Sequence, residues 1–171
     1  MESFKASQFG EWSVFGLPAF ADNYLWVLVH GASRSAIAVD PGCADTVKGF
    51  LNQHGVHLSG ILVTHHHPDH VGGIQELINH FNYKFDIIGL KRVNTVSRVV
   101  NDGAVIDFHG VKIHAMGVPG HTRDHLAYVL SIGTETWLFC GDTLFSAGCG
   151  RLFEGTAQDM YNSLQKINQL P

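Results

Sequence analysis

One short run, THHHPDH at residues 64–70, holds much of the chain's potential for chemistry. It follows the apolar residues 60–63, which are typical of a buried strand. Side chains alternate along an extended segment, so we expect His65 and His67 to point to one side and His66 to the other. Two imidazoles on one side can share a metal ion. The run therefore predicts one half of a metal site, with His66 as a spacer.

Further potential ligands stand at the start of an expected helix and just past two expected strands: Asp69, His70, His121 and Asp142. The last two lie in PGHT at residues 119–122 and in GDT at residues 141–143. Strand ends that meet at one edge of a sheet can present side chains to a shared site. Histidine and aspartate without thiolate suit zinc, iron or manganese at a hydrolytic centre. Divided between two ions, this set would activate a water molecule.

Composition limits the kind of protein. The chain has 171 residues, 45% hydrophobic and 15% charged, which suits one compact globular domain. The net charge is −4 and only 11 residues are Lys or Arg, so we expect no nucleic-acid partner. Histidine is over-represented, with 12 residues.

Cysteine usage and apolar runs indicate the compartment. Cys43, Cys140 and Cys149 form no CxxC pair, so we expect no disulfide framework and a reducing cytoplasm. Residues 1–10 contain no apolar stretch typical of a secretory leader, and no run elsewhere is long enough to cross a membrane. We expect a soluble, cytoplasmic monomer.

Hydrophobic periodicity predicts the elements that position these side chains. Strands are expected at residues 24–29, 35–39, 60–63, 85–88, 104–108, 111–116, 126–131 and 136–140. Helices are expected at residues 44–54, at 71–82, and from the Thr156/Asp159 capping pair to the chain end. Residues 91–102 fit no pattern. The order predicts one α/β domain in which helices cover sheet faces.

The three motifs resemble the metal motifs of the metallo-β-lactamase superfamily, and the resemblance runs from about residue 14 to the end. Within it, LPAFADNY at residues 17–24 and GDTLFSAGCGRLFEGT at residues 141–156 are similar to the glyoxalase II family. The resemblance implies an αββα sandwich of two mixed β-sheets flanked by helices. Residues 1–171 would be a near-complete catalytic domain, ending before the family's seventh metal ligand and its C-terminal helical substrate-binding domain.

The resemblance also implies roles for individual residues. The first metal site would comprise His65, His67, His121 and Asp142; the second would comprise Asp69, His70 and the same Asp142. Substrate contacts would come from Arg151, Cys149 and Phe153. The cofactors would be two divalent ions, zinc before iron or manganese. The implied reaction is hydrolysis of a glutathione thioester, S-lactoylglutathione, to glutathione and D-lactate, the second step of methylglyoxal detoxification.

Several alternatives stay open. A single-iron persulfide dioxygenase of the same superfamily needs only ligands near His65, His121 and Asp142, and a partial chain could bind metal but be catalytically weak. Asp40 is either a turn residue or the partner that orients a ligand histidine. His125 follows His121 at i+4 and is either a further ligand or a support for one.

Overall fold

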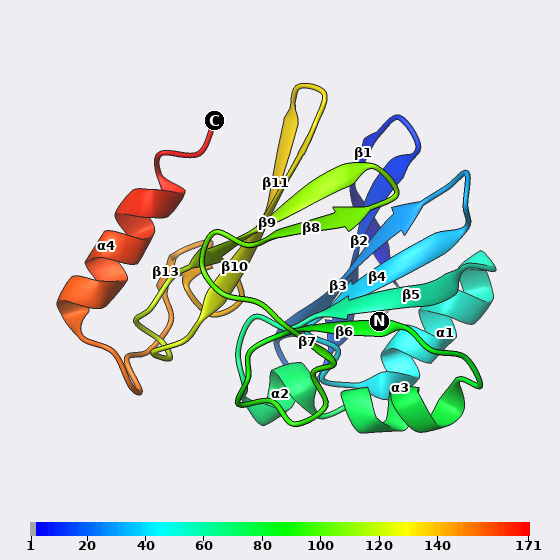
Figure 1. Cartoon of the computed structure of the whole chain (residues 1–171), viewed down its shortest axis with the longest axis horizontal. Coiled ribbons are helices and arrows are strands. Elements are labelled where there is room, and N and C mark those ends of the chain that lie inside the picture. Colours follow the sequence, from blue (N-terminus) through cyan, green and yellow to red (C-terminus); the bar gives the residue numbers. More distant parts are fainter. Residues whose placement is uncertain (1–2) are drawn as a thin grey trace. The chain divides into compact units, whose positions relative to one another are not determined.

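The computed structural model describes residues 3–171 and divides into two compact units, Met1–Val99 and Val100–Pro171 (Figure 1). The expectation that residues 1–10 form no secretory leader falls partly on residues 1 and 2, which lie outside the described part. Within residues 3–171, no helix combines the length and the apolar character needed to cross a membrane.

The first unit contains a seven-stranded mixed sheet whose strands lie in sequence order. They are β1 (Phe4–Phe9), β2 (Trp12–Ala19), β3 (Asn23–His30), β4 (Ser35–Val39), β5 (His57–Leu62), β6 (Asp86–Gly89) and β7 (Arg98–Val99). Strands β1 to β4 pair antiparallel and β4 to β7 pair parallel. The predicted strands of this unit are confirmed, whereas β1, β2 and β7 were not predicted.

Helices occupy the β4–β5 and β5–β6 connections of the parallel half, where a crossover is needed. The first, α1 (Ala44–His54), is confirmed at its predicted bounds and ends at Gly55 in the left-handed conformation, with φ 59°. The predicted helix 71–82 is wrong in its bounds: the structure has two short helices, α2 (Pro68–Val71) and α3 (Ile74–His80). The glycine pair between them interrupts the helix.

The register of the parallel strands sets the position of the THHHPDH run. Val39 of β4 lies beside Leu62 of β5, so both strands end at the same edge of the sheet. The Asp40 N–H donates to the Leu62 carbonyl at 2.9 Å. Residues that follow β4 are thereby held against residues that follow β5.

The second unit contains a four-stranded sheet in the order β11-β10-β9-β8. Its strands are β8 (Val105–Phe108), β9 (Val111–Gly117), β10 (Leu126–Ile132) and β11 (Glu135–Phe139), and a separate hairpin comprises β12 (Leu144–Phe145) and β13 (Gly148–Cys149). The four predicted strands are confirmed, but this sheet is antiparallel rather than mixed. The loops that join its strands contain no helix, and short connections favour antiparallel pairing.

Strands β9 and β11 flank β10 and both run antiparallel to it, so their carboxyl ends meet at one edge. Gly117 pairs with Leu126, and Phe139 pairs with Tyr128. The loops that carry PGHT and GDT therefore leave the sheet on either side of the start of β10.

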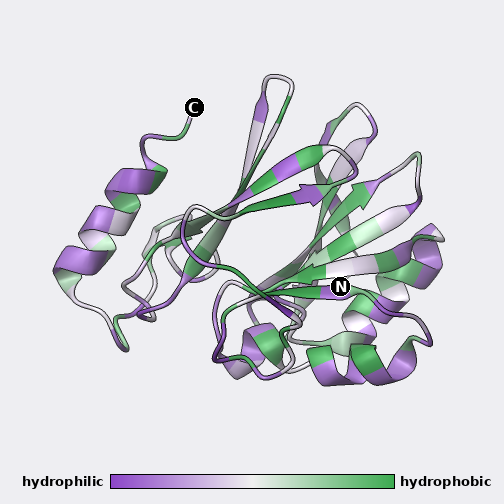
Figure 2. Ribbon diagram, viewed as in Figure 1, coloured by the Kyte–Doolittle hydropathy of each residue, from purple (hydrophilic) through white to green (hydrophobic). Residues whose placement is uncertain are grey.

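Helix α4 (Ala157–Ile167) carries both hydrophilic and hydrophobic residues (Figure 2) and supports the PGHT loop. Ile167 packs with the buried Val118. The Ser163 hydroxyl donates to the Pro119 carbonyl at 2.6 Å, and the Lys166 ammonium donates to the Gly117 carbonyl at 3.0 Å. The helix thus fixes the backbone that leads to His121.

The predicted capping pair of α4 is confirmed and yields a test. The Thr156 hydroxyl accepts from the Asp159 N–H, and the Asp159 carboxylate accepts from the Thr156 N–H. We expect Thr156→Ala to lower the free energy of unfolding by about 1 kcal/mol, because α4 loses its cap. Thr156→Ser retains the hydroxyl and should match the wild type in urea unfolding.

The difference between these two variants should depend on pH. Hydrogen bonds from Thr156 hold the pKa of Asp159 below its usual value. Stabilisation by this carboxylate is present above the ordinary pKa of aspartate and is lost as the pH falls through the lowered value. The difference between the two variants should shrink on acidification, because the hydroxyl also donates to the Asp159 carboxylate, and should not vanish, because the hydroxyl still accepts from the Asp159 N–H. Equal stability at neutral pH would contradict the role of the cap.

Candidate metal centre

A single buried carboxylate organises the THHHPDH run. Asp40 is 6% exposed and has φ 49°, a left-handed conformation that aspartate tolerates better than most residues. One oxygen, Oδ1, accepts from the Thr64 N–H at 2.7 Å. The other, Oδ2, accepts from the Thr64 hydroxyl at 2.6 Å and from His70 Nδ1 at 3.0 Å. Of the two open roles for Asp40, these contacts favour the one that orients a histidine.

The same contacts fix which ring nitrogens carry protons. The Thr64 hydroxyl has one hydrogen and gives it to Asp40, so its oxygen accepts from His65 Nδ1 at 3.0 Å. His65 therefore keeps a lone pair on Nε2. His70 donates from Nδ1 to the Asp40 carboxylate, which directs its Nε2 away from that carboxylate. Asp40 thus orients two predicted metal ligands, His70 directly and His65 through Thr64.

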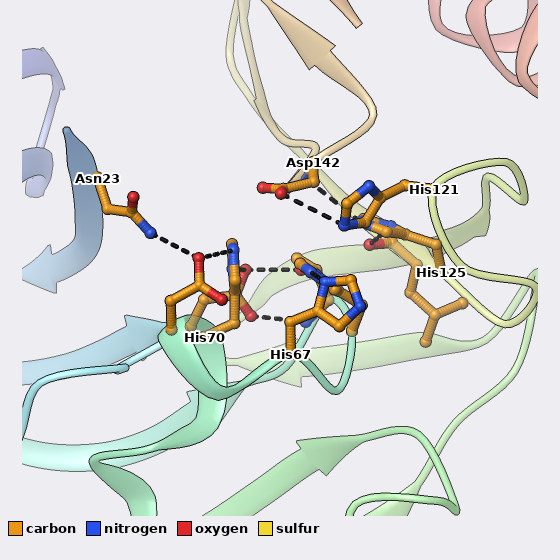
Figure 3. A network of polar contacts seen from close by, with 11 residues as sticks. Asn23, His67, His70, His121, His125 and Asp142 are labelled. Carbon is orange, nitrogen blue, oxygen red and sulfur yellow. Dashed lines mark hydrogen bonds and ion pairs between the residues drawn. The ribbon is translucent and has the colours of Figure 1, made fainter. Parts of the chain in front are cut away.

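Two pairs of ligand atoms meet in the first unit (Figure 3). His65 Nε2 lies 3.2 Å from His67 Nδ1, and His70 Nε2 lies 3.5 Å from Asp69 Oδ2. Two ligand atoms on one tetrahedral zinc, each about 2.0–2.1 Å from the ion, lie about 3.4 Å apart. Both spacings fit a divalent ion between the partners.

A third group of potential ligand atoms belongs to Asp40, His65 and His70, which lie within 4.8 Å of one another. Both oxygens of Asp40 already accept hydrogen bonds from protein donors. We therefore read Asp40 as a support for the ligands rather than as a ligand. Its buried charge is compensated by these donors.

The second unit contains another imidazole that faces a carboxylate. His121 is 3% exposed and donates from Nδ1 to the Arg151 carbonyl at 2.8 Å. A carbonyl can only accept, so His121 keeps its lone pair on Nε2, which lies 3.4 Å from Asp142 Oδ2. A lone pair and a carboxylate oxygen at this distance are stabilised by a cation between them. The predicted ligands His121 and Asp142 therefore lie together in this unit.

His125 positions the predicted ligand Asp142 rather than adding a further ligand. Its Nδ1 donates to the Leu126 carbonyl at 3.1 Å, and its Nε2 accepts from the Asp142 N–H at 3.2 Å. Both ring nitrogens thus have protein partners. Of the two roles left open for His125, the structure favours the one that positions Asp142.

The GCGRLFEGT stretch is attached to the PGHT loop mainly through its backbone. The Phe153 N–H donates to the His121 carbonyl at 3.2 Å, and the Gly155 N–H donates to the Gly120 carbonyl at 3.1 Å. The Phe153 ring also lies edge-on to the His121 ring, with centroids 5.2 Å apart. This stretch therefore helps to hold His121, a predicted metal ligand.

The predicted substrate contacts all lie on this stretch with exposed side chains: Cys149, Arg151 and Phe153. Phe153 is 62% exposed. Their contact with a substrate stays a prediction. The main chain of Arg151 has a further role that the spacing of residues in the sequence did not indicate: its carbonyl orients His121.

Local spacing also did not indicate a contact between the first residue of β3 and α2. The Asn23 amide donates to Asp69 Oδ2 at 2.9 Å (Figure 3). Asn23 lies in LPAFADNY, a stretch singled out only by its resemblance. The two residues are 46 positions apart, which places this contact beyond any periodicity argument.

The Asp40 network can be tested with Asp40→Asn, since asparagine also tolerates a left-handed backbone. One oxygen becomes a donor that faces other donors, so Thr64 or His70 must reverse its hydrogen bond. We expect metal affinity to fall about 10- to 100-fold and unfolding free energy to fall by about 1–3 kcal/mol. Asp86→Asn, at an exposed position on β6, is the matched control. Zinc titration calorimetry that does not distinguish the two variants would refute the role of Asp40.

The close packing behind His121 can be tested with Gly150→Ala. A Cβ at this position would lie 1.8 Å from the Asp142 carbonyl oxygen and 3.0 Å from His121 Nδ1. Both ligand loops must move to admit it, so we expect weaker metal binding and a loss of about 1–3 kcal/mol of stability. Gly49→Ala is the control, because a Cβ there meets nothing within 4 Å and should stabilise α1 by about 0.5–1 kcal/mol. Unchanged zinc retention by Gly150→Ala would contradict this packing.

Known proteins share this fold and these motifs. Residues 21–94 and 90–171 match the metallo-β-lactamase superfamily. The chain is 48% identical over 157 residues to a hydroxyacylglutathione hydrolase of Aliivibrio salmonicida and 43% identical over 157 residues to one of Vibrio cholerae. Each match covers 91% of this chain, and the chain spans about 60% of the length of these relatives.

A solved structure, BLEG-1 B3 metallo-β-lactamase, superposes with a TM-score of 0.81 over 92% of this chain and 87% of that one, at 21% identity. At this identity the likeness shows the fold alone, and it confirms the predicted metallo-β-lactamase fold. The motifs, the paired imidazole and carboxylate groups and these matches agree: the chain belongs to the metallo-β-lactamase superfamily.

Proposed function

We propose that this chain is the metal-binding catalytic part of a hydroxyacylglutathione hydrolase of the glyoxalase II type. Its reaction would convert an S-(2-hydroxyacyl)glutathione, such as S-lactoylglutathione, to glutathione and a 2-hydroxy acid, D-lactate. The observation that carries the proposal is the pairing of an oriented imidazole with a carboxylate in each unit, His70 with Asp69 and His121 with Asp142. The names of the curated relatives support the thioester substrate.

The ligand assignment is part of the proposal. His65, His67 and His121 would hold one ion, Asp69 and His70 would hold a second, and Asp142 would be shared. Zinc suits imidazole and carboxylate ligands, as do iron and manganese. The Asp69–His70 pair supports a second ion, which the single-iron dioxygenase alternative does not need.

When bound, two divalent ions lower the pKa of a coordinated water and stabilise negative charge on the substrate carbonyl oxygen. The protein's own groups set the conditions for that chemistry. Asp40 and Thr64 hold His65 and His70 in the tautomers that present Nε2. A thiolate leaves at neutral pH without a strong general acid. The proposed reaction therefore needs no catalytic side chains beyond the metal ligands and their hydrogen-bond partners.

Substrate recognition is proposed for the exposed side chains of the GCGRLFEGT stretch. Arg151 offers a guanidinium that can pair with a glutathione carboxylate, and Phe153 offers an apolar face beside His121. Because the Arg151 carbonyl orients His121, the same residue would connect the substrate to a ligand. The cytoplasmic location, the monomeric state and the lack of a nucleic-acid partner stay predictions from composition.

The proposal is tested by thioester hydrolysis with the zinc-loaded protein. We expect release of free thiol from S-lactoylglutathione, and a fall in kcat/KM of more than about 100-fold in His67→Ala, because one ligand is lost. His57→Ala, at an exposed position on β5, should leave the rate unchanged. A folded wild type without thioesterase activity, or a rate insensitive to His67→Ala, would refute the proposal.

A second pair of measurements examines substrate recognition. Arg151→Ala should raise KM for the glutathione thioester and leave KM unchanged for an N-acetylcysteamine thioester of the same acyl group, which has no carboxylate to bind. An equal effect on both substrates would contradict the proposed role of the guanidinium. Oxygen uptake on glutathione persulfide by a one-iron protein would favour the dioxygenase instead.

A further inference from the structure

Asp69 differs from the other proposed ligands of the first unit in its surroundings. Its side chain is 48% exposed, whereas His65 is fully buried and the His70 side chain is 12% exposed. An exposed carboxylate has several rotamers available, so burial alone does not hold it toward His70. The position of Asp69 Oδ2 therefore needs a specific contact.

The main chain of Asp69 is held from one side by the loop that follows β4. A Cβ at Gly42 would lie 1.8 Å from the Asp69 carbonyl oxygen, so only glycine permits this approach. The neighbouring Gly73 N–H donates to the Pro41 carbonyl at 3.0 Å. These contacts fix the backbone of α2 and leave the Asp69 side chain to be oriented separately.

Asn23 supplies the side-chain contact. It is the first residue of β3, where it pairs with Ala19 across a turn in which Phe20 has φ 53°. Its Nδ2 donates to Asp69 Oδ2 at 2.9 Å, and the same oxygen lies 3.5 Å from His70 Nε2 (Figure 3). The amide thus holds the oxygen that faces the histidine.

We propose that Asn23 is a positioning residue for the Asp69–His70 half of the metal centre. It fixes the rotamer of the Asp69 carboxylate so that Oδ2 and His70 Nε2 face one divalent cation, and it touches neither the cation nor the substrate. This inference rests on the proposed function only in requiring that Asp69 and His70 bind a metal ion.

A neutral amide suits this role on chemical grounds. A carboxylate oxygen has two lone pairs, so the Asn23 hydrogen bond leaves one for a cation. A lysine or arginine at position 23 would set a positive charge against the cation, and an aspartate would face Asp69 with like charge. Asparagine orients the carboxylate without changing the net charge of the site.

The test is a titration of the metal-free protein with Co²⁺, in which each binding step is monitored by visible absorption and by calorimetry. His70→Ala identifies the binding step that belongs to the Asp69–His70 half, because that step is lost. Asn23→Ala should weaken the same step about 10- to 100-fold and leave the other step unchanged. Asn52→Ala, on the exposed face of α1, should titrate as the wild type does. Thermal unfolding of the metal-free variants checks that each is folded.

The outcomes separate this inference from the proposed function. If Asn23→Ala titrates as the wild type does, or weakens only the step that His70→Ala leaves intact, the role of Asn23 is wrong while the two-metal assignment stands. If the wild type shows no step that His70→Ala removes, the metal assignment of the proposed function fails, and the role of Asn23 fails with it.

Discussion

The buried carboxylate of Asp40 is the group on which two proposed ligands of the first unit, His65 and His70, depend. Parallel pairing of β4 with β5 brings it beside Thr64, where it accepts one backbone and two side-chain hydrogen bonds. Leaving such a charge without donors inside a protein would cost several kcal/mol. Because Thr64 and His70 supply the donors, the same interactions that stabilise the charge also decide where His65 and His70 keep their lone pairs.

In the second unit, backbone carbonyls rather than a carboxylate decide which ring nitrogen of each histidine keeps its lone pair. The Arg151 carbonyl orients His121, and the Leu126 carbonyl orients His125, which in turn accepts from the Asp142 N–H. Arg151, whose side chain is exposed, therefore also holds the proposed ligand His121 through its main chain. This explains why Gly150 has no room for a Cβ between the two ligand loops.

Much of the candidate site could be predicted because it lies at strand ends. Alternation in the THHHPDH run indicated that His65 and His67 share a side, and the structure brings their ring nitrogens to 3.2 Å. The contact from Asn23 to Asp69 and the Arg151 carbonyl depend on tertiary packing, which local spacing does not encode. In the fold, Gly16 and Pro18 obscured the alternation of β2, and the glycine pair after α2 divided a predicted helix.

The central claim is that the proposed ligands of this chain bind two metal ions. The most direct measurement is elemental analysis of the purified protein after zinc loading and exhaustive dialysis, with protein concentration taken from amino-acid analysis. The account predicts about two zinc ions per chain, falling to about one when both Asp69 and His70 are replaced by alanine. One ion or none in the folded wild type would contradict it.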